Sequence, residues 1–320
     1  MVGDRVTRTV AIAGAGSIGV AFALLFARAG FNVRMWDALP GAFDRATPDL
    51  LDRLDLLDRF DALHEPTHTI AARVSYHDIL LDALDGAELV QECAPESLEI
   101  KRELFQQLGA YSDSKTVLAS SSSAIVASQF ATATPARDRV LIAHPGNPPY
   151  LIPVIELVPS PFTSSEIVDR AEQIYVEAGL RPVRVRKEIE GFVFNRLQGA
   201  LLREAYALVR DGVASVADID LVVTQGLGRR WSVIGPFETI DLNTRGGVES
   251  HAAKMGPAYA RMGAERGQDD PWTDELVTEV ARQRREQLPL DHWDERVRWR
   301  DEQLLRRQVL DHDPSPTKNA

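Results

Sequence analysis

A glycine-rich turn near the N-terminus constrains the fold of this chain more than any other feature. Residues 14–19 read Gly-Ala-Gly-Ser-Ile-Gly, between an apolar run at Thr9–Ala13 and a helical pattern at Ser17–Ala29. In such a strand–turn–helix unit the first glycine permits a tight turn, the second lets the main chain approach a pyrophosphate, and the third lets the helix pack on the strand. We therefore predict a dinucleotide-binding turn. Its expected cofactor contacts are Gly14, Gly16, Ser17, Ile18 and Gly19.

The identity of the dinucleotide follows from the end of the second predicted strand, Asn32–Trp36. Asp37 comes directly after it, 18 residues beyond Gly19. A carboxylate at this position accepts hydrogen bonds from ribose hydroxyls and repels a 2′-phosphate. The next residues, Ala38 and Leu39, offer no arginine to hold that phosphate. We therefore expect NAD rather than NADP as the cofactor.

Strand and helix patterns alternate through the first half of the chain, with a helical pattern at Glu99–Leu108. Further strands are expected at residues 73–75, 88–93, 116–118, 140–143 and 182–185. Alternation of this kind predicts parallel strands joined by crossover helices. The expected class is α/β, with an N-terminal Rossmann-type, doubly wound sheet.

The second half has helical periodicity without strand punctuation, so we predict an all-α C-terminal domain. Its expected helices are residues 192–209, 216–224, 247–262, 272–287 and 294–310. A length of 320 residues is ample for two domains. We predict an NAD-binding domain at residues 1–190 and a helical domain at residues 191–320.

Composition excludes several classes of protein. The net charge of −11 argues against a general nucleic-acid binder, which needs surplus Lys and Arg to displace counterions. The single cysteine, Cys93, cannot form an internal disulfide. No signal-peptide pattern and no apolar run of membrane-spanning length is present. We expect a soluble cytoplasmic protein with no membrane or nucleic-acid partner.

Candidate catalytic residues gather between residues 120 and 156. His144 ends the predicted strand 140–143, and four serines, Ser120–Ser123, follow the strand 116–118. Ligands bind beyond the carboxyl ends of strands in open α/β sheets, so both groups are expected to face the cofactor. Imidazole ionises near neutral pH and suits proton removal from an alcohol, while Glu156 is a carboxylate able to orient the ring. The alternative is a strand-end histidine with a purely structural hydrogen bond. The other six histidines show no metal-binding spacing, so no metal is expected.

Long motifs give a more specific indication. The chain resembles the L-3-hydroxyacyl-CoA dehydrogenase superfamily over nearly its whole length, and within it the lambda-crystallin branch of L-gulonate 3-dehydrogenases. The resemblance is carried by residues 91–97, 143–150, 155–159, 191–198, 226–231 and 235–239.

The resemblance implies roles for particular residues. His144 would be the general acid/base and Glu156 its partner. Ser123, with Ser122 as the open alternative, would hydrogen-bond the substrate oxygen together with Asn195. Asn147 would shape the nicotinamide pocket, and Glu96 and Lys101 would lie near the cofactor.

The substrate is expected to be a small 3-hydroxy acid, L-gulonate in the first instance. Arg230 is a candidate for binding its carboxylate through the planar guanidinium, against the alternative of a surface arginine in a turn. At the position of Gly146 the gulonate branch commonly has a larger apolar residue. Together with Leu151 and Ile152, this difference predicts an enlarged or reshaped pocket. An L-3-hydroxyacyl-CoA and L-carnitine stay open as substrates, and Trp231 could face the quaternary ammonium of L-carnitine. A non-catalytic, NAD-binding or structural role also stays open. The resemblance also implies that the helical domain, residues 191–320, serves substrate binding and dimerisation, so that a homodimer is expected.

Overall fold

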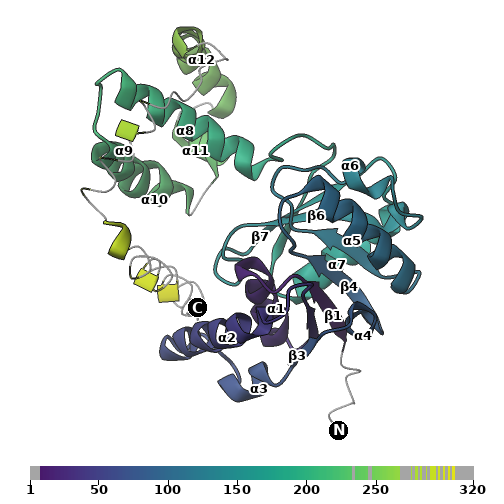
Figure 1. Cartoon of the computed structure of the whole chain (residues 1–320). Coiled ribbons are helices and arrows are strands. Elements are labelled where there is room, and N and C mark those ends of the chain that lie inside the picture. Colours follow the sequence, from purple (N-terminus) through teal and green to yellow (C-terminus); the bar gives the residue numbers. More distant parts are fainter. Residues whose placement is uncertain are drawn as a thin grey trace, which may run out of the picture. The chain divides into compact units, whose positions relative to one another are not determined.

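The computed structural model describes residues 8–232, 235–243 and 247–266, together with single positions between 275 and 306. The chain divides into two compact units (Figure 1). The first contains the described residues up to Arg196 and the described positions from Arg298 onward. The second begins at Leu197 and ends at Val297. Each unit is described separately below.

The first unit is built on one eight-stranded sheet of order β3-β2-β1-β4-β5-β6-β7-β8. All neighbouring strands are parallel except β6 and β7, which are antiparallel. The strands are β1 (Thr9–Ala13), β2 (Asn32–Trp36), β3 (Val74–His77), β4 (Ala87–Glu92), β5 (Val117–Ser120), β6 (Val140–Pro145), β7 (Val154–Pro159) and β8 (Arg181–Arg184). The predicted Rossmann-type sheet is confirmed, whereas the sequence analysis did not identify β7.

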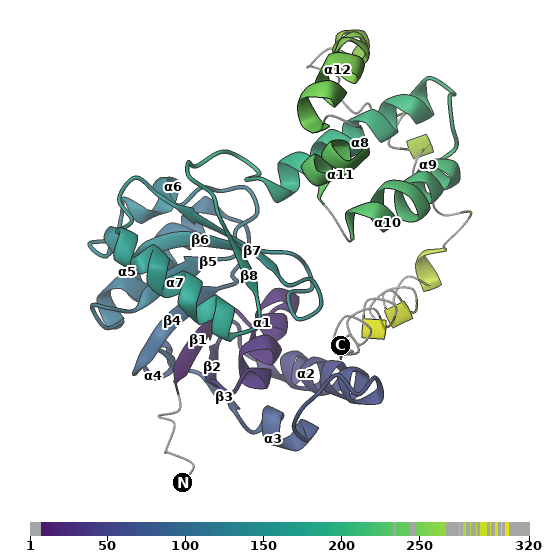
Figure 2. The same ribbon diagram turned by 180° about the vertical axis from the view of Figure 1, so that it is seen from behind.

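Helices cover both faces of the sheet (Figure 1 and Figure 2). They are α1 (Ser17–Arg28), α2 (Ala42–Arg59), α3 (Thr67–Ala71), α4 (Leu80–Leu84), α5 (Leu98–Tyr111), α6 (Ser128–Ala131), the short η1 (Arg137–Arg139) and α7 (Ser165–Glu177). One apolar layer packs α1, α2 and α7 against the sheet, and the other packs α4, α5 and α6 against its opposite face. Because both faces are buried, the central strands are apolar runs rather than alternating ones.

Local sequence explains where the site-bearing helix α5 begins. The Ser97 hydroxyl accepts a hydrogen bond from the main-chain N–H of Ile100, at 3.4 Å, which caps the first turn. Lys101, Leu104 and Phe105 then fall on the buried side of the helix. Lys101 is therefore directed into the protein, unlike an ordinary surface lysine.

The second unit is helical, as predicted. It begins within α8 (Phe194–Arg210), which starts in the first unit. It continues through α9 (Val216–Val222), the π-helical turn η2 (Val223–Leu227), α10 (Gly228–Trp231), α11 (Pro236–Asn243), α12 (Gly247–Arg266) and the short η3 (Leu290–His292). The sequence analysis did not identify α11. The helices expected at residues 272–287 and 294–310 lie largely outside the described residues.

Candidate active site

The glycine turn between β1 and α1 has the geometry that a dinucleotide requires. Gly14 has φ = +116°, and a Cβ placed there would lie 2.7 Å from the Cys93 carbonyl. A Cβ on Gly19 would lie 1.8 Å from the main-chain oxygen of Gly14. A Cβ on Gly16, by contrast, would have no atom within 4 Å. Gly14 and Gly19 thus serve the packing of the turn, while Gly16 keeps one side of it open.

A cavity of about 710 Å³ lies beside this turn. Asp37 lines it, and its carboxylate is fixed in place by main-chain N–H groups of Ala15, at 2.7 Å, and Leu39, at 2.8 Å. Each carboxylate oxygen retains accepting capacity for a ribose hydroxyl. The open glycine turn and the anchored acid fit NAD. Arg45 also lines the cavity. The sequence analysis missed it because it comes from α2 rather than from the strand end.

His144 and Glu156 face each other across the antiparallel pair β6–β7. They are directly opposed residues in the ladder, and Nδ1 of His144 lies 2.8 Å from Oε2 of Glu156. Both side chains are buried. Because a carboxylate only accepts hydrogen bonds, Nδ1 carries the proton and the other ring nitrogen, Nε2, keeps its lone pair. No hydrogen-bond partner for Nε2 is found among the described residues. This is the arrangement of an oriented general base.

The second oxygen of Glu156 ties this pair to the start of α8. Oε1 accepts hydrogen bonds from the main-chain N–H groups of Val193, at 2.7 Å, and Phe194, at 3.0 Å. A turn with positive φ at Gly191 (74°) and Phe192 (49°) precedes them. A non-glycine residue in this region is uncommon and is often found at functional sites. The ring of Phe192 packs against His144, with centroids 5.5 Å apart.

The serine loop, residues 121–125, follows β5. Ser122 is buried, and its hydroxyl donates to Glu96, at 2.6 Å, and lies 2.9 Å from the Ile125 oxygen. Ser123 is exposed, and its hydroxyl has no hydrogen bond to any residue that the structure describes. The side chain of Asn195 donates to the main-chain oxygen of Ser123, at 3.1 Å. The structure therefore brings Ser123 and Asn195 together and leaves the Ser123 hydroxyl available.

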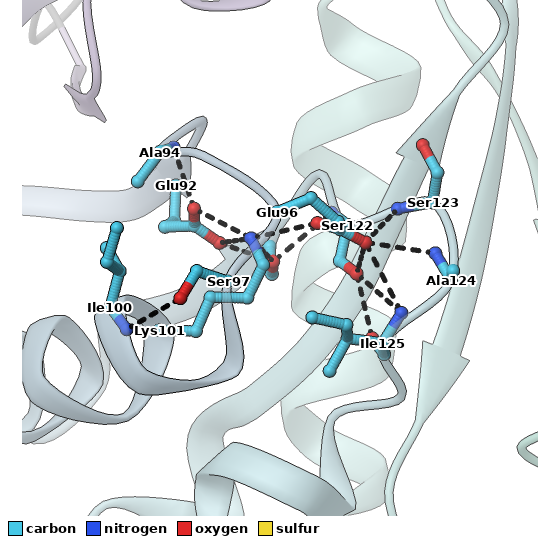
Figure 3. A network of polar contacts seen from close by, with 11 residues as sticks. Glu92, Ala94, Glu96, Ser97, Ile100, Lys101, Ser122, Ser123, Ala124 and Ile125 are labelled. Carbon is cyan, nitrogen blue, oxygen red and sulfur yellow. Dashed lines mark hydrogen bonds and ion pairs between the residues drawn. The ribbon is translucent and has the colours of Figure 1, made fainter.

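Glu96 and Lys101, both expected near the cofactor, belong to one polar network, in which the side chain of Lys101 is 1% exposed and that of Glu96 41% (Figure 3). The Lys101 ammonium contacts Glu92 at 2.9 Å and Glu96 at 3.4 Å. Burial raises the pKa of Glu92, against the opposing effect of the Lys101 charge. Burial alone would also raise the pKa of Glu96. The Ser122 hydrogen bond and the Lys101 charge outweigh burial and hold the pKa of Glu96 below its ordinary value.

Glu92 was missed as a site residue in the sequence analysis. The available signal was a charged residue inside the apolar run 89–94, which requires a buried countercharge.

The remaining expected residues have less defined surroundings. Asn147 is exposed directly after the β6 end. Arg230 is exposed on α10, in the second unit, with no hydrogen bond or ion pair found among the described residues. At Gly146, an added Cβ would lie 2.5 Å from Cγ2 of Ile152. Ile152 therefore occupies the space beside Gly146, so this position by itself does not enlarge the pocket, while the reshaping expected as the alternative stays a prediction.

No group of His, Cys, Asp and Glu is arranged to hold a metal ion within the part of the chain that the structure describes. None of its described helices combines the length and apolar character needed to cross a membrane.

Comparison with known proteins gives consistent matches over both units. Residues 9–189 match the family model of the 3-hydroxyacyl-CoA dehydrogenase NAD binding domain, and residues 191–287 that of the 3-hydroxyacyl-CoA dehydrogenase C-terminal domain. Lambda-crystallin of Oryctolagus cuniculus is 37% identical over 96% of this chain and 97% of its own length. L-carnitine dehydrogenase of Streptomyces coelicolor is 38% identical over 83% of this chain and 80% of its own.

One solved structure resembles this chain over nearly its whole length. The NAD⁺-dependent dismutase 5-formyl-3-hydroxy-2-methylpyridine 4-carboxylic acid 5-dehydrogenase superposes with a TM-score of 0.82 at 27% identity. The match covers 96% of this chain and 99% of that one.

Proposed function

The chain belongs to the 3-hydroxyacyl-CoA dehydrogenase family, and from this membership we propose that it oxidises the 3-hydroxyl of L-gulonate to 3-dehydro-L-gulonate. Its class is that of an NAD-dependent oxidoreductase acting on CH–OH groups. The observation that carries the proposal is the buried His144–Glu156 pair, whose free Nε2 lies on the same sheet edge as the serine loop.

The mechanism uses the residues as they are arranged. Nε2 of His144 removes the proton of the substrate hydroxyl, and Glu156 stabilises the imidazolium that forms. The hydroxyl of Ser123 and the side-chain amide of Asn195, which retains one N–H beyond its bond to Ser123, hold the substrate oxygen. NAD, when bound at the glycine turn, supplies the hydride acceptor. Orientation of alcohol against base contributes much of the rate.

L-gulonate is favoured by the full-length similarity to lambda-crystallin, which covers 96% of the chain. Arg230 is exposed and presents a guanidinium able to bind a carboxylate bidentately. L-carnitine is the second candidate, since a carnitine dehydrogenase is as similar in identity, at 38%, and Trp231 is 40% exposed and offers a ring face to a quaternary ammonium. A purely structural role would not require the His144–Glu156 pair with its free Nε2.

The helical unit is proposed to form a homodimer. Large apolar side chains remain exposed on its described helices and connecting segments: Leu197, Leu201, Val213, Leu221, Val222, Trp231, Phe237, Tyr259 and Met262. Covering apolar surface of this extent favours association. Light scattering after size exclusion tests it. Leu221→Glu should shift a dimer toward monomer, while Val176→Glu on α7 should not. A monomeric wild-type protein would contradict the proposal.

The substrate is tested by following NADH formation with L-gulonate, L-carnitine and L-3-hydroxybutyryl-CoA in parallel. Turnover with L-gulonate alone supports the proposal, and Arg230→Lys should then raise KM for gulonate with little change in kcat, because Lys lacks the bidentate fork. Turnover with L-carnitine or the thioester alone would overturn the substrate assignment. A protein that binds NAD but oxidises none of the three would overturn the proposed function.

A further inference from the structure

The fully buried ion pair Glu92–Lys101 of the first unit has no role in the mechanism proposed above. Both side chains are at most 1% exposed. The ammonium of Lys101 lies 2.9 and 3.0 Å from the two carboxylate oxygens of Glu92. Glu92 also accepts hydrogen bonds from the hydroxyl of Ser120 and the main-chain N–H of Ala94. Removing two charges from water is costly unless they are paired and hydrogen-bonded, and here every polar atom has a partner.

A third charged residue, Glu96, connects this ion pair to the serine loop. Lys101 also lies 3.4 Å from Oε2 of Glu96, which is only partly buried. Oε1 of Glu96 then accepts hydrogen bonds from the Ser122 hydroxyl and from the main-chain N–H groups of three consecutive residues, Ser123, Ala124 and Ile125, at 3.1–3.3 Å. Figure 3 shows these contacts converging on a single carboxylate.

A carboxylate bound by several consecutive N–H groups fixes the main chain that carries them. The main-chain oxygen of Ser123 is in turn the acceptor for Asn195. The loop that Glu96 holds is therefore the one that sets both substrate-oxygen contacts of the proposed reaction.

We infer that Glu92 and Lys101 are positioning residues for this reaction: Lys101, held by Glu92, orients Glu96, and Glu96 holds the serine loop in the geometry that presents Ser123 and docks Asn195. The inference rests on the proposed function for its consequence in catalysis.

The competing explanation is that the pair only fastens α5 to β4. The two explanations differ in a charge-neutral double variant. Lys101→Met alone leaves Glu92 buried without its countercharge, which is expected to destabilise the fold. Glu92→Gln combined with Lys101→Met removes both charges and should recover thermal stability. Glu96 nevertheless remains without its cation, so the loop should stay loose and kcat/KM should remain low.

The first experiment therefore compares steady-state kcat/KM for wild type, Lys101→Met, the Glu92→Gln/Lys101→Met pair, Glu96→Ala and the Lys101→Met/Glu96→Ala pair. The surface variant Lys115→Met is the matched control and should behave as wild type. We expect Lys101→Met to lower kcat/KM about tenfold or more, and adding it to Glu96→Ala to cost less than about threefold, because residues acting through one another are not additive. Additive losses, or a neutral pair with wild-type kcat/KM, would overturn the inference.

The second experiment does not depend on turnover, so it separates failure of this inference from failure of the proposed function. Amide hydrogen exchange of the segment 121–126 should become about tenfold or more faster in Lys101→Met and in the neutral pair. In the neutral pair, which should recover global stability, exchange of the segments of β1 and α1 should match wild type. NAD titration of the same variants is the companion measurement. Unchanged exchange in the loop, or a loss of NAD affinity in Lys101→Met that Glu96→Ala does not share, would show that Lys101 does not act through Glu96.

Discussion

Glu156 lies directly opposite His144 in the antiparallel pair β6–β7 and holds its ring by one carboxylate oxygen, at 2.8 Å. The other oxygen binds the first main-chain N–H groups of the segment that enters α8. One side chain therefore contacts both the ring of His144 and the start of the helix α8. Asn195 lies in the same segment, so the base and the amide expected to hold the substrate oxygen share one anchor.

Replacing the base tests the chemical step. His144→Ala should lower kcat by about 10²–10⁴-fold, the usual contribution of a positioned general base. NAD affinity should stay nearly unchanged, because the glycine turn and Asp37 lie on other strands. Steady-state kinetics with an NAD titration measure both. A variant that keeps more than about a tenth of the rate would exclude His144 as the base.

Two substitutions of Glu156 separate its charge from its anchoring role. Glu156→Gln keeps an oxygen able to accept from Val193 and Phe194, so the melting temperature should change little while kcat falls about tenfold or more, because the imidazolium loses its counter-ion. Glu156→Ala should lower both kcat and the melting temperature, since the main-chain N–H groups of Val193 and Phe194 lose their acceptor. Equal melting temperatures for the two variants would show that the α8 contacts carry no stability.

Substitution of Gly16 should affect NAD affinity, whereas substitution of Gly19 should affect the stability of the fold. Gly16→Ala adds a methyl group to the open side of the turn, so NAD affinity should drop about tenfold or more with thermal stability preserved. Gly19→Ala places a Cβ against main chain, 1.8 Å from the Gly14 oxygen, so the protein itself should be destabilised. Thermal melts with and without NAD distinguish the two. Normal NAD affinity in Gly16→Ala would place the cofactor elsewhere.

Asp37 should set the preference for NAD over NADP. Asp37→Ala removes the group that accepts from the ribose and repels a 2′-phosphate, so the NAD/NADP ratio of kcat/KM should fall about tenfold or more. Arg45 lines the same cavity and supplies a cation for the phosphate. Asp37→Ala/Arg45→Ala should therefore use NADP less well than Asp37→Ala. An unchanged ratio in Asp37→Ala would mean that this carboxylate does not touch the ribose.

The lowered pKa of Glu96 predicts how the serine loop responds to acid. Its pKa is lower in the folded protein than in the unfolded chain, so the ionised carboxylate stabilises the loop above the unfolded value. That stabilisation is lost as the pH falls through the lowered, folded-state value. Amide exchange of residues 123–125, corrected for its intrinsic pH dependence, should stay slow through the ordinary glutamate range and accelerate only below it. Glu96→Gln should abolish this acid-dependent step, and a step that persists would belong to another group.

The local parts of the fold were predictable because they depend on neighbours in the chain. The bounds of β1 and β2 were predicted as the structure has them, and the glycine turn, Asp37 and the parallel sheet follow from strand, turn and helix in succession. The strand β7 was missed because Glu156 interrupts its apolar run, Pro153 precedes it and Pro159 is its last residue. Only pairing with β6 explains that charge, since it lies opposite His144.

Nothing in the spacing of single residues predicted the contacts between separate elements. In the sequence Lys101 is an ordinary helix lysine, and only the packing of α5 against the sheet directs it at Glu92. In the same way, Gly146 suggests a loss of side-chain volume, and only the folded structure shows that Ile152 fills the space. The hydrogen bond between Ser122 and Glu96 is of the same kind, because Glu96 comes from another loop. The sequence by itself determined the fold class, the cofactor turn and the acid/base candidates, through periodicity and motif. Only tertiary packing decided which polar side chains are buried together, because the cost of burying a charge is offset by groups distant in the chain.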